Sequence, residues 1–150
     1  MNRVVADFTA DATRDKKIRL KDLRGQNVVL YFYPKDSTPG CTTEGRDFSE
    51  LHARFRRRNT VIFGISRDSL ASHEKFRDKQ GFMFDLISDP DEKLCKKFDV
   101  IHEKTLYGRK FMGVVRSTFL IDADGKLRKE WRKLKVKGHA EEVLEAVKAL

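Results

Sequence analysis

The run Val28-Val29-Leu30-Tyr31-Phe32-Tyr33 constrains the fold of this chain more than any other segment. An unbroken series of β-branched, aliphatic and aromatic residues is typical of a strand buried on both faces, as in the parallel centre of an α/β sheet. Pro34 ends the run, and a polar, turn-forming stretch covers 35–40. Apolar side chains then recur at helical spacing, which predicts a helix from about Gly40 or Cys41 to Asn59. The residues on its inner face are Phe48, Leu51, His52 and Phe55.

The alternation of strands and helices continues along the chain. We expect strands at 61–66 and 85–88, and a helix at 69–80 that buries Leu70 and Phe76 and stops at Gly81. Asp89-Pro90 is expected to open another helix, and 102–113 to be an irregular loop. Strands at 117–121 and 126–134, joined by a turn at 122–125, and a helix at 139–150 complete the chain.

This order of elements predicts the fold class. Alternating β and α units need a parallel sheet, and a hairpin adds antiparallel strands to it. Residues 1–150 are therefore expected to form a single domain with a thioredoxin-like α/β fold, a mixed β-sheet flanked by helices on both faces.

Charge and length limit the partners of the chain. Its net charge is +9, and basic residues concentrate at 54–58 and at seven of the twelve positions from Lys126 to Lys137. Nucleic-acid binding is one interpretation of these basic residues. Because the sequence contains no nucleic-acid-binding motif, we favour a solvated helix end for the first group and the outer face of a strand for the second.

No apolar run approaches the roughly 20 residues of a membrane-spanning helix, and the N-terminus lacks the apolar region of a secretory signal. A cytoplasmic protein is expected.

The two cysteines, Cys41 and Cys95, form neither a disulfide framework nor a Cys-x-x-Cys pair. Because the four histidines are scattered, neither a metal nor another cofactor is expected. Cys41 falls where the first helix begins, and the unpaired backbone N–H groups and the helix dipole there favour an anion. We expect its thiol to be partly or wholly thiolate, the nucleophilic form, with a buried apolar filler as the alternative.

The residues around Cys41 resemble a known active site. Residues 34–41, Pro-Lys-Asp-Ser-Thr-Pro-Gly-Cys, are similar to the Pro-x-x-x-Thr-x-x-Cys motif of the peroxiredoxins. The longer run 28–43, VVLYFYPKDSTPGCTT, looks like their bacterioferritin-comigratory or peroxiredoxin Q subfamily. Segments 5–8, 64–69 and 116–122 resemble other parts of that subfamily in the same order. The resemblance implies a thiol-dependent peroxidase that reduces hydrogen peroxide and organic hydroperoxides in antioxidant defence.

The resemblance also implies roles for individual residues. Cys41 would attack one peroxide oxygen and become a sulfenic acid. Thr38 would aim its hydroxyl at the peroxide and the thiolate, and Arg116 would stabilise the thiolate and the charge that develops as the O–O bond breaks. Pro34 would shape the loop and shield the site, and Glu44 would orient Arg116. The alternatives are a turn residue or helix cap for Thr38, a surface cation for Arg116 and a dipole-favoured carboxylate for Glu44.

The chain departs from many members of the subfamily because both usual positions of a resolving cysteine carry arginine. These positions are Arg46, five residues after the peroxidatic cysteine, and Arg77 on the next helix. Cys95 is interpreted as a small buried residue beside Leu94 and Phe98, with a resolving role as the alternative. We therefore expect a one-cysteine peroxidase that is recycled by an external thiol such as thioredoxin, glutaredoxin or a glutathione-like donor.

Two other functions are conceivable for a chain with this sequence. A nucleic-acid-binding or chaperone-like protein on the same scaffold is motivated by the basic residues at 126–137. A disulfide reductase is disfavoured, because no Cys-x-x-Cys pair can trap a mixed disulfide. Both a monomer and a weak dimer are compatible with the sequence, as are hydrogen peroxide and bulkier hydroperoxides as preferred substrates.

Overall fold

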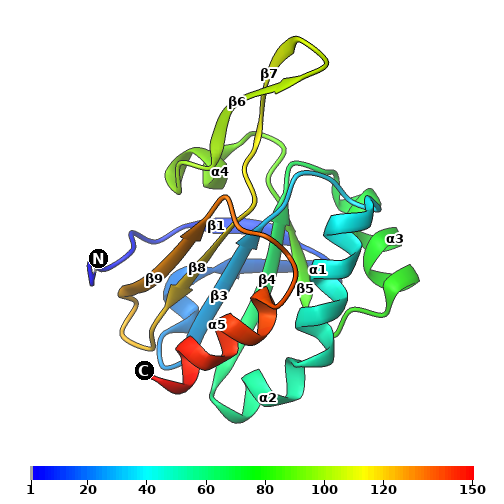
Figure 1. The fold of residues 1–150 in the computed structure, drawn as a ribbon. Helices are drawn as coiled ribbons and strands as arrows, with labels where there is room; N and C mark the ends of the chain where they lie inside the picture. Colours follow the sequence, from blue (N-terminus) through cyan, green and yellow to red (C-terminus); the bar gives the residue numbers. More distant parts are fainter. Residues whose placement is uncertain (1) are drawn as a thin grey trace.

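The computed structural model describes residues 2–150, which are built around a seven-stranded mixed sheet (Figure 1). The strand order is β2-β1-β5-β4-β3-β8-β9, and a separate two-stranded ribbon pairs β6 with β7. The strands are β1 (Thr9–Ala12), β2 (Lys16–Arg19), β3 (Asn27–Phe32), β4 (Thr60–Ser66), β5 (Asp85–Ser88), β6 (Ile101–Leu106), β7 (Arg109–Val114), β8 (Ser117–Ile121) and β9 (Leu127–Arg132). The helices are η1 (Leu20–Leu23, 3₁₀), α1 (Pro39–Glu50), α2 (His52–Arg57), α3 (Leu70–Gln80), α4 (Lys93–Lys97) and α5 (His139–Lys148).

The centre of the sheet confirms the predicted mixed α/β arrangement. Strand β3 pairs in parallel with β4 on one side, and β4 pairs in parallel with β5. On its other side β3 pairs antiparallel with β8, which forms the expected hairpin with β9. Because β3 and β4 run the same way, the segments that follow them leave from one edge of the sheet. The Tyr33 N–H donates to the Ile65 carbonyl at 3.0 Å there.

The buried side chains form two cores, one on each face of the sheet. Residues alternate along a strand, so Val29 and Tyr31 belong to one core and Leu30 and Phe32 to the other. The core that contains Val29 and Tyr31 also includes side chains of α1, α2, α3 and α5, among them Cys41. The core that contains Leu30 and Phe32 also includes side chains of η1 and α4, among them Cys95. The two cysteines therefore lie on opposite faces of the sheet.

The predicted helix 40–59 is in fact two helices. The backbone of Leu51 (φ −92°, ψ 0°) leaves helical geometry and separates α1 from α2. With this turn, Phe48 of α1 and Phe55 of α2 both reach the core, where their ring centroids lie 6.0 Å apart. The helical spacing of the apolar residues correctly predicts that Phe48 and Phe55 are buried, but it does not predict the break between α1 and α2 at Leu51.

Two further predictions about elements are wrong, and two strands were not predicted. Leu70 was expected to be buried, but it is 37% exposed in the first turn of α3, where His73 and Phe76 face inward instead. Helix α4 begins at Lys93, later than the predicted start at Asp89, because the Asp89 carboxylate accepts hydrogen bonds from the N–H groups of residues 94 and 95. Strands β1 and β2 were not predicted; β1 extends the sheet by pairing antiparallel with β5.

The segment 102–113, predicted as an irregular loop, lies in the β6–β7 hairpin that projects from the sheet in Figure 1. Tyr107 and Gly108, the two residues between the strands, both have positive φ (51° and 77°), which suits a tight turn between twisted strands. The hairpin is largely exposed, with Leu106, Tyr107, Phe111 and Met112 among its solvent-facing residues. Without a buried face, the strands leave no alternating hydrophobic pattern in the sequence.

The basic segments lie at exposed positions. The arginines at 54 and 56–58 are exposed at the C-terminal end of α2, where cations complement the helix dipole. The cations of β9 line an edge of the sheet, where charge discourages pairing with another chain. None of the helices within residues 2–150 has the length and apolar character needed to cross a bilayer.

Candidate active site

Cys41 lies in the first turn of α1, at the edge of the sheet where β3 ends. Its side chain is buried, with 2% of the residue exposed. The first N–H groups of a helix have no partners within the helix, so the sulfur lies where a negative charge is favoured. The nearest fixed cation is Arg116, whose Nη2 donates to the Cys41 Sγ at 3.3 Å.

Arg116 connects the cysteine to a buried carboxyl group. While Nη2 contacts the sulfur, Nη1 donates to the Glu44 Oε1 at 2.7 Å. Gly40 leaves room for this approach, because a Cβ atom there would lie 3.2 Å from Nη2 of Arg116, a tighter contact than usual. The guanidinium thus bridges a thiol and a carboxyl group from the first two turns of α1.

Glu44 is buried, with 1% of the residue exposed, and its Oε2 has no hydrogen-bond partner among the described residues. Burial raises the pKa of Glu44 to about 7, and this effect outweighs the attraction of the nearby Arg116 guanidinium. For Arg116, burial acts to lower the pKa, but the Glu44 and Cys41 charges together raise it above the usual value. Arg116 therefore remains a cation.

Thr38 and Pro34 lie in the loop that leads from β3 into α1. Thr38 is the N-cap residue of α1, and its carbonyl accepts a hydrogen bond from the Thr42 N–H at 2.9 Å. Its hydroxyl donates to the Lys35 carbonyl at 2.8 Å instead of capping the helix. The lone pairs of Oγ1 are left to accept from another donor. Pro34 is half-buried directly after β3.

The structure adds two residues that the sequence analysis did not single out. Lys104 of β6 is influenced by the charges of the site. Burial first, and then the Arg116 charge, lower the pKa of Lys104, and the opposing effect of Cys41 is smaller. Asp36 is buried in the loop before Cys41 and binds His73 of α3. The carboxylate was visible in the active-site motif, but its partner is 37 residues away in the sequence, so only the fold reveals the pair.

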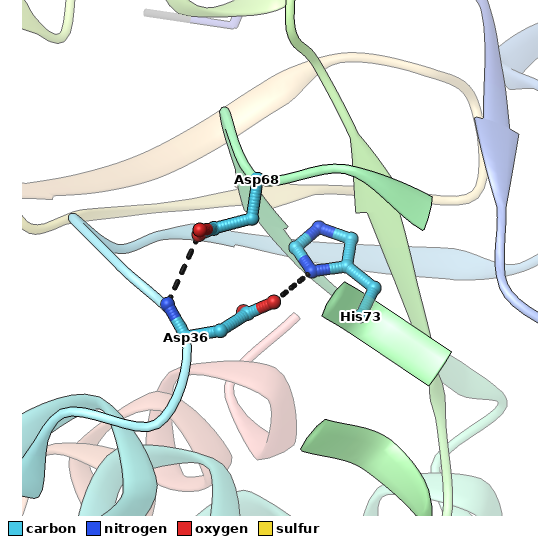
Figure 2. Close-up of side chains that lie close together, drawn as sticks. All are labelled: Asp36, Asp68 and His73. Atoms are coloured by element: carbon cyan, nitrogen blue, oxygen red, sulfur yellow. Dashed lines mark hydrogen bonds and ion pairs between the residues drawn. The ribbon is translucent and has the colours of Figure 1, made fainter. Parts of the chain in front are cut away.

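Asp36, Asp68 and His73 also form the one group of potential metal ligands among residues 2–150, with ligand atoms within 4.8 Å of one another. These ligand atoms already form hydrogen bonds within the protein (Figure 2). Asp36 Oδ2 lies 2.7 Å from His73 Nδ1, and Asp68 Oδ2 accepts from the Asp36 N–H at 3.0 Å and from the Ser66 hydroxyl at 2.6 Å. The arrangement is a closed hydrogen-bond network rather than a vacant ligand set.

Cys95 is buried like Cys41, but its surroundings differ. It is fully buried in α4, and its backbone N–H donates to the Asp89 carboxylate at 2.8 Å. Burial first, and then the neighbouring Asp89 carboxylate, raise the pKa of the Cys95 thiol far above its ordinary value. A thiol in this setting stays protonated and is a poor nucleophile.

Comparison with known proteins places the chain among related sequences. Residues 1–130 match the model of the AhpC/TSA family. Peroxiredoxin Bcp of Xanthomonas campestris is 56% identical over 125 residues, covering 83% of this chain and 78% of that protein. Peroxiredoxin Bcp of Bacillus subtilis is 46% identical over 142 residues, covering 95% of this chain and 90% of that protein.

Solved structures agree with these sequence comparisons. A variant of Xanthomonas campestris peroxiredoxin Q superposes with a TM-score of 0.93 at 46% identity, covering 99% of both chains. The bacterioferritin comigratory protein of the same organism, studied for its alkyl peroxide reduction activity, superposes with a TM-score of 0.91 at 49% identity. That match covers 95% of this chain and 90% of the other.

Proposed function

Since the chain belongs to the AhpC/TSA family and is a peroxiredoxin, a thiol-dependent peroxidase, we propose that it reduces hydrogen peroxide and organic hydroperoxides through Cys41. The products are water or an alcohol, and the role is antioxidant defence. The observation that carries this proposal is the Arg116 guanidinium, 3.3 Å from the Cys41 sulfur at the start of α1. The same guanidinium is held by Glu44 at 2.7 Å.

The chemical step is a displacement at oxygen. The Cys41 thiolate attacks the hydrogen-bearing oxygen of the peroxide, an S–O bond forms, and the O–O bond breaks. The sulfur is oxidised to a sulfenic acid, and the other oxygen leaves as hydroxide or alkoxide and takes up a proton to become water or an alcohol. The thiolate supplies the electron pair, so no metal or organic cofactor enters this step.

The neighbouring residues act on this displacement through charge and position. Arg116 stabilises the thiolate before attack and the negative charge that grows on the peroxide oxygens during attack. Because the Thr38 hydroxyl already donates to Lys35, it meets the peroxide as an acceptor and orients the peroxide O–H. Pro34 shields the pocket and fixes the loop, and Glu44 orients Arg116.

Recycling uses an external thiol. Cys95 lies in the core on the other face of the sheet, and arginines occupy positions 46 and 77. A donor thiol attacks the Cys41 sulfenic acid, releases water and leaves a mixed disulfide, and a second thiol then restores Cys41. Thioredoxin, glutaredoxin and glutathione-like donors all supply this chemistry. We further propose a single domain that is a monomer or weak dimer, acting in the cytoplasm.

Intact mass spectrometry after one equivalent of hydrogen peroxide tests the proposal. The reduced protein should gain one oxygen at Cys41, and dimedone should trap this sulfenic acid. Cys41→Ser should abolish peroxide reduction while leaving the fold intact, as judged by circular dichroism. Normal turnover by Cys41→Ser with dithiothreitol as reductant would show that Cys41 is not the reacting thiol.

A further inference from the structure

Large apolar side chains are exposed together on the β6–β7 hairpin, which extends beyond the rest of the molecule (Figure 1). Tyr107 is 96% exposed and Leu106 57%, and Phe111 and Met112 are exposed beside them. The remaining exposed large hydrophobic residues within 2–150 come from separate segments of the chain. Single exposed hydrophobic residues are normal on a protein surface, whereas a group of them marks an interaction site.

The register of the hairpin places a cation beside the apolar side chains near its turn. Leu106 pairs with Arg109, and Lys104 pairs with Phe111 further from the turn. Residues directly opposite each other in an antiparallel pair share one face, and so do residues two apart in a strand. These four side chains therefore lie on the same face of the ribbon. Tyr107 occupies the turn itself, so the tip is aromatic and aliphatic with basic side chains behind it.

The hairpin is positively charged. It holds Lys104, Arg109 and Lys110 against one acid, Glu103, and these three cations against one anion give a formal net charge of +2 with histidine neutral. Lys110 and Glu103 lie 3.8 Å apart and both are exposed, so water weakens this pair. An exposed apolar tip with cations beside it suits an anionic lipid surface, where apolar groups enter the interface and Lys and Arg bind the headgroups. Tyrosine is favoured at the same depth, because its ring is apolar and its hydroxyl is polar.

Charge favours a lipid surface over a second copy of the chain as the partner of this tip. Two hairpins in contact would bring the cations of one against those of the other, and the whole chain carries a net charge of +9. The cytoplasmic leaflet of a membrane carries the opposite sign, because it contains anionic lipids. The hairpin is also a two-stranded ribbon, which offers a narrow tip rather than the broad patch of a stable protein interface.

The other end of the hairpin adjoins the active site. Strand β7 ends at Val114, and Arg116 follows two residues later with its guanidinium on the Cys41 sulfur. Burial and the Arg116 charge lower the pKa of Lys104, so this hairpin residue lies close to the active-site cation. The six residues of β7 span about 20 Å at roughly 3.3 Å each. The tip is thus about one hairpin length away from Cys41.

We propose that the β6–β7 hairpin docks the protein on the anionic lipid surface of a membrane. Leu106 and Tyr107 enter the headgroup region, and Arg109 and Lys110 bind lipid phosphates. The protein is then a peripheral one, held at the cytoplasmic leaflet with Cys41 about one hairpin length from the bilayer. Docking goes beyond the proposed peroxidase function and does not depend on it, because none of these four residues contacts Cys41.

Co-sedimentation of the full chain with vesicles tests the docking. The protein should sediment with vesicles of phosphatidylcholine and phosphatidylglycerol in equal parts, and much less with phosphatidylcholine alone. Binding should weaken as sodium chloride is raised, because salt screens the headgroup charge. The double variant Leu106→Ser, Tyr107→Ser should bind on the order of tenfold more weakly, because it loses the apolar groups that enter the interface.

A fluorescent variant shows whether the tip itself enters the lipid. The wild-type chain has one tryptophan, Trp131, which lies on β9 rather than on the hairpin. Tyr107→Trp adds a second one at the tip. Its emission should shift to the blue on addition of anionic vesicles and should be quenched by brominated lipid, whereas the emission of the wild type should change little.

Two matched controls separate the hairpin from the general charge and apolar surface of the chain. Met83→Ser removes a large residue that is 61% exposed outside the hairpin, and it should bind vesicles like the wild type. The pair Arg109→Gln, Lys110→Gln should lose on the order of tenfold in binding. Removing the same charge from α2 with Arg54→Gln, Arg56→Gln should lose much less. All these variants should reduce hydrogen peroxide at the wild-type rate and keep the wild-type circular dichroism.

Three results would overturn the docking role. The first is absence of binding to anionic vesicles at low salt, and the second is equal loss of binding from the α2 pair and the hairpin pair. The third is a dimer in lipid-free solution, seen by sedimentation velocity, that the variant Leu106→Ser, Tyr107→Ser dissociates. That dimer would assign the exposed tip to a second copy of the chain. Binding that the hairpin variants lose and both controls keep supports docking through the hairpin.

Discussion

The guanidinium of Arg116 contacts the sulfur of Cys41, with Nη2 3.3 Å from Sγ, although Arg116 follows the β6–β7 hairpin and lies 75 residues after Cys41 in the sequence. The register of the sheet explains this contact. Strand β8 pairs antiparallel with β3 so that Ser117 lies opposite Phe32, the last residue of β3. Arg116 precedes Ser117, and it therefore emerges at the edge where the loop to α1 begins.

Arg116→Ala should slow the reaction of Cys41 with hydrogen peroxide. The Cys41 sulfur loses the cation that lies 3.3 Å from it, and loss of one such group commonly raises a barrier by about 2–4 kcal/mol. Alkylation of Cys41 by iodoacetamide should also slow, because a nearby cation favours the nucleophilic form of a thiol. Arg128→Ala, which removes an arginine paired with Asp122 elsewhere, is the control. Unchanged alkylation and peroxidase rates in Arg116→Ala would show that the contact between Arg116 and Cys41 does not contribute to the reactivity of the thiol.

Glu44→Gln should alter how stability depends on pH. Burial raises the pKa of Glu44 in the folded protein from the ordinary 4.5 to about 7, so folding disfavours the ionised carboxylate. Wild-type stability should therefore fall as pH rises from about 4.5 to 7, by up to about 3 kcal/mol. In Glu44→Gln this loss should be absent, as measured by urea unfolding at pH 5 and pH 8. A parallel loss in both proteins would contradict the prediction.

Cys95→Ser should turn over at nearly the wild-type rate with dithiothreitol or a thioredoxin-type donor. Cys95 lies in the core on the opposite face of the sheet from Cys41, and a disulfide tolerates a Cα separation of only about 7 Å. Non-reducing peptide mapping after one equivalent of peroxide provides the direct measurement. A stoichiometric Cys41–Cys95 disulfide, together with failure of a donor protein to recycle Cys95→Ser, would make Cys95 the resolving cysteine.

Asp85→Asn should remove a pH-dependent part of the stability at the other end of the sheet. Burial alone would raise the pKa of Asp85, but hydrogen bonds from Arg14, Lys16 and Thr13 lower it to about 2, below the ordinary value of 3.8. The stabilisation, about 2 kcal/mol, is complete above pH 3.8 and is lost as pH falls towards 2. Urea midpoints at pH 7 and pH 2.5 should differ less in Asp85→Asn than in the wild type. Equal differences would exclude this ion pair as a source of acid sensitivity.

Local sequence alone determined the central strand, the turn and the start of α1. The apolar run before Pro34 is buried as expected, because a strand covered on both faces needs apolar residues at every position. The position of Cys41 at a helix N-terminus followed from the turn residues and the helical spacing after them. Patterns of this kind succeed because they depend on neighbours within one or two turns of chain.

Other features became visible only in the tertiary structure. The β6–β7 hairpin has no buried face to create a pattern, and the break at Leu51 leaves the helical spacing unchanged. The contact of Asp36 with His73 joins segments that are remote in sequence, and so does the contact of Cys41 with Arg116, which the family resemblance, but no local pattern, had implied. Strand register and helix packing decide which remote side chains meet, and no local pattern encodes that choice. The local sequence thus determined where the thiol lies, and the packing of the strands and helices brings Arg116 and Glu44 to it.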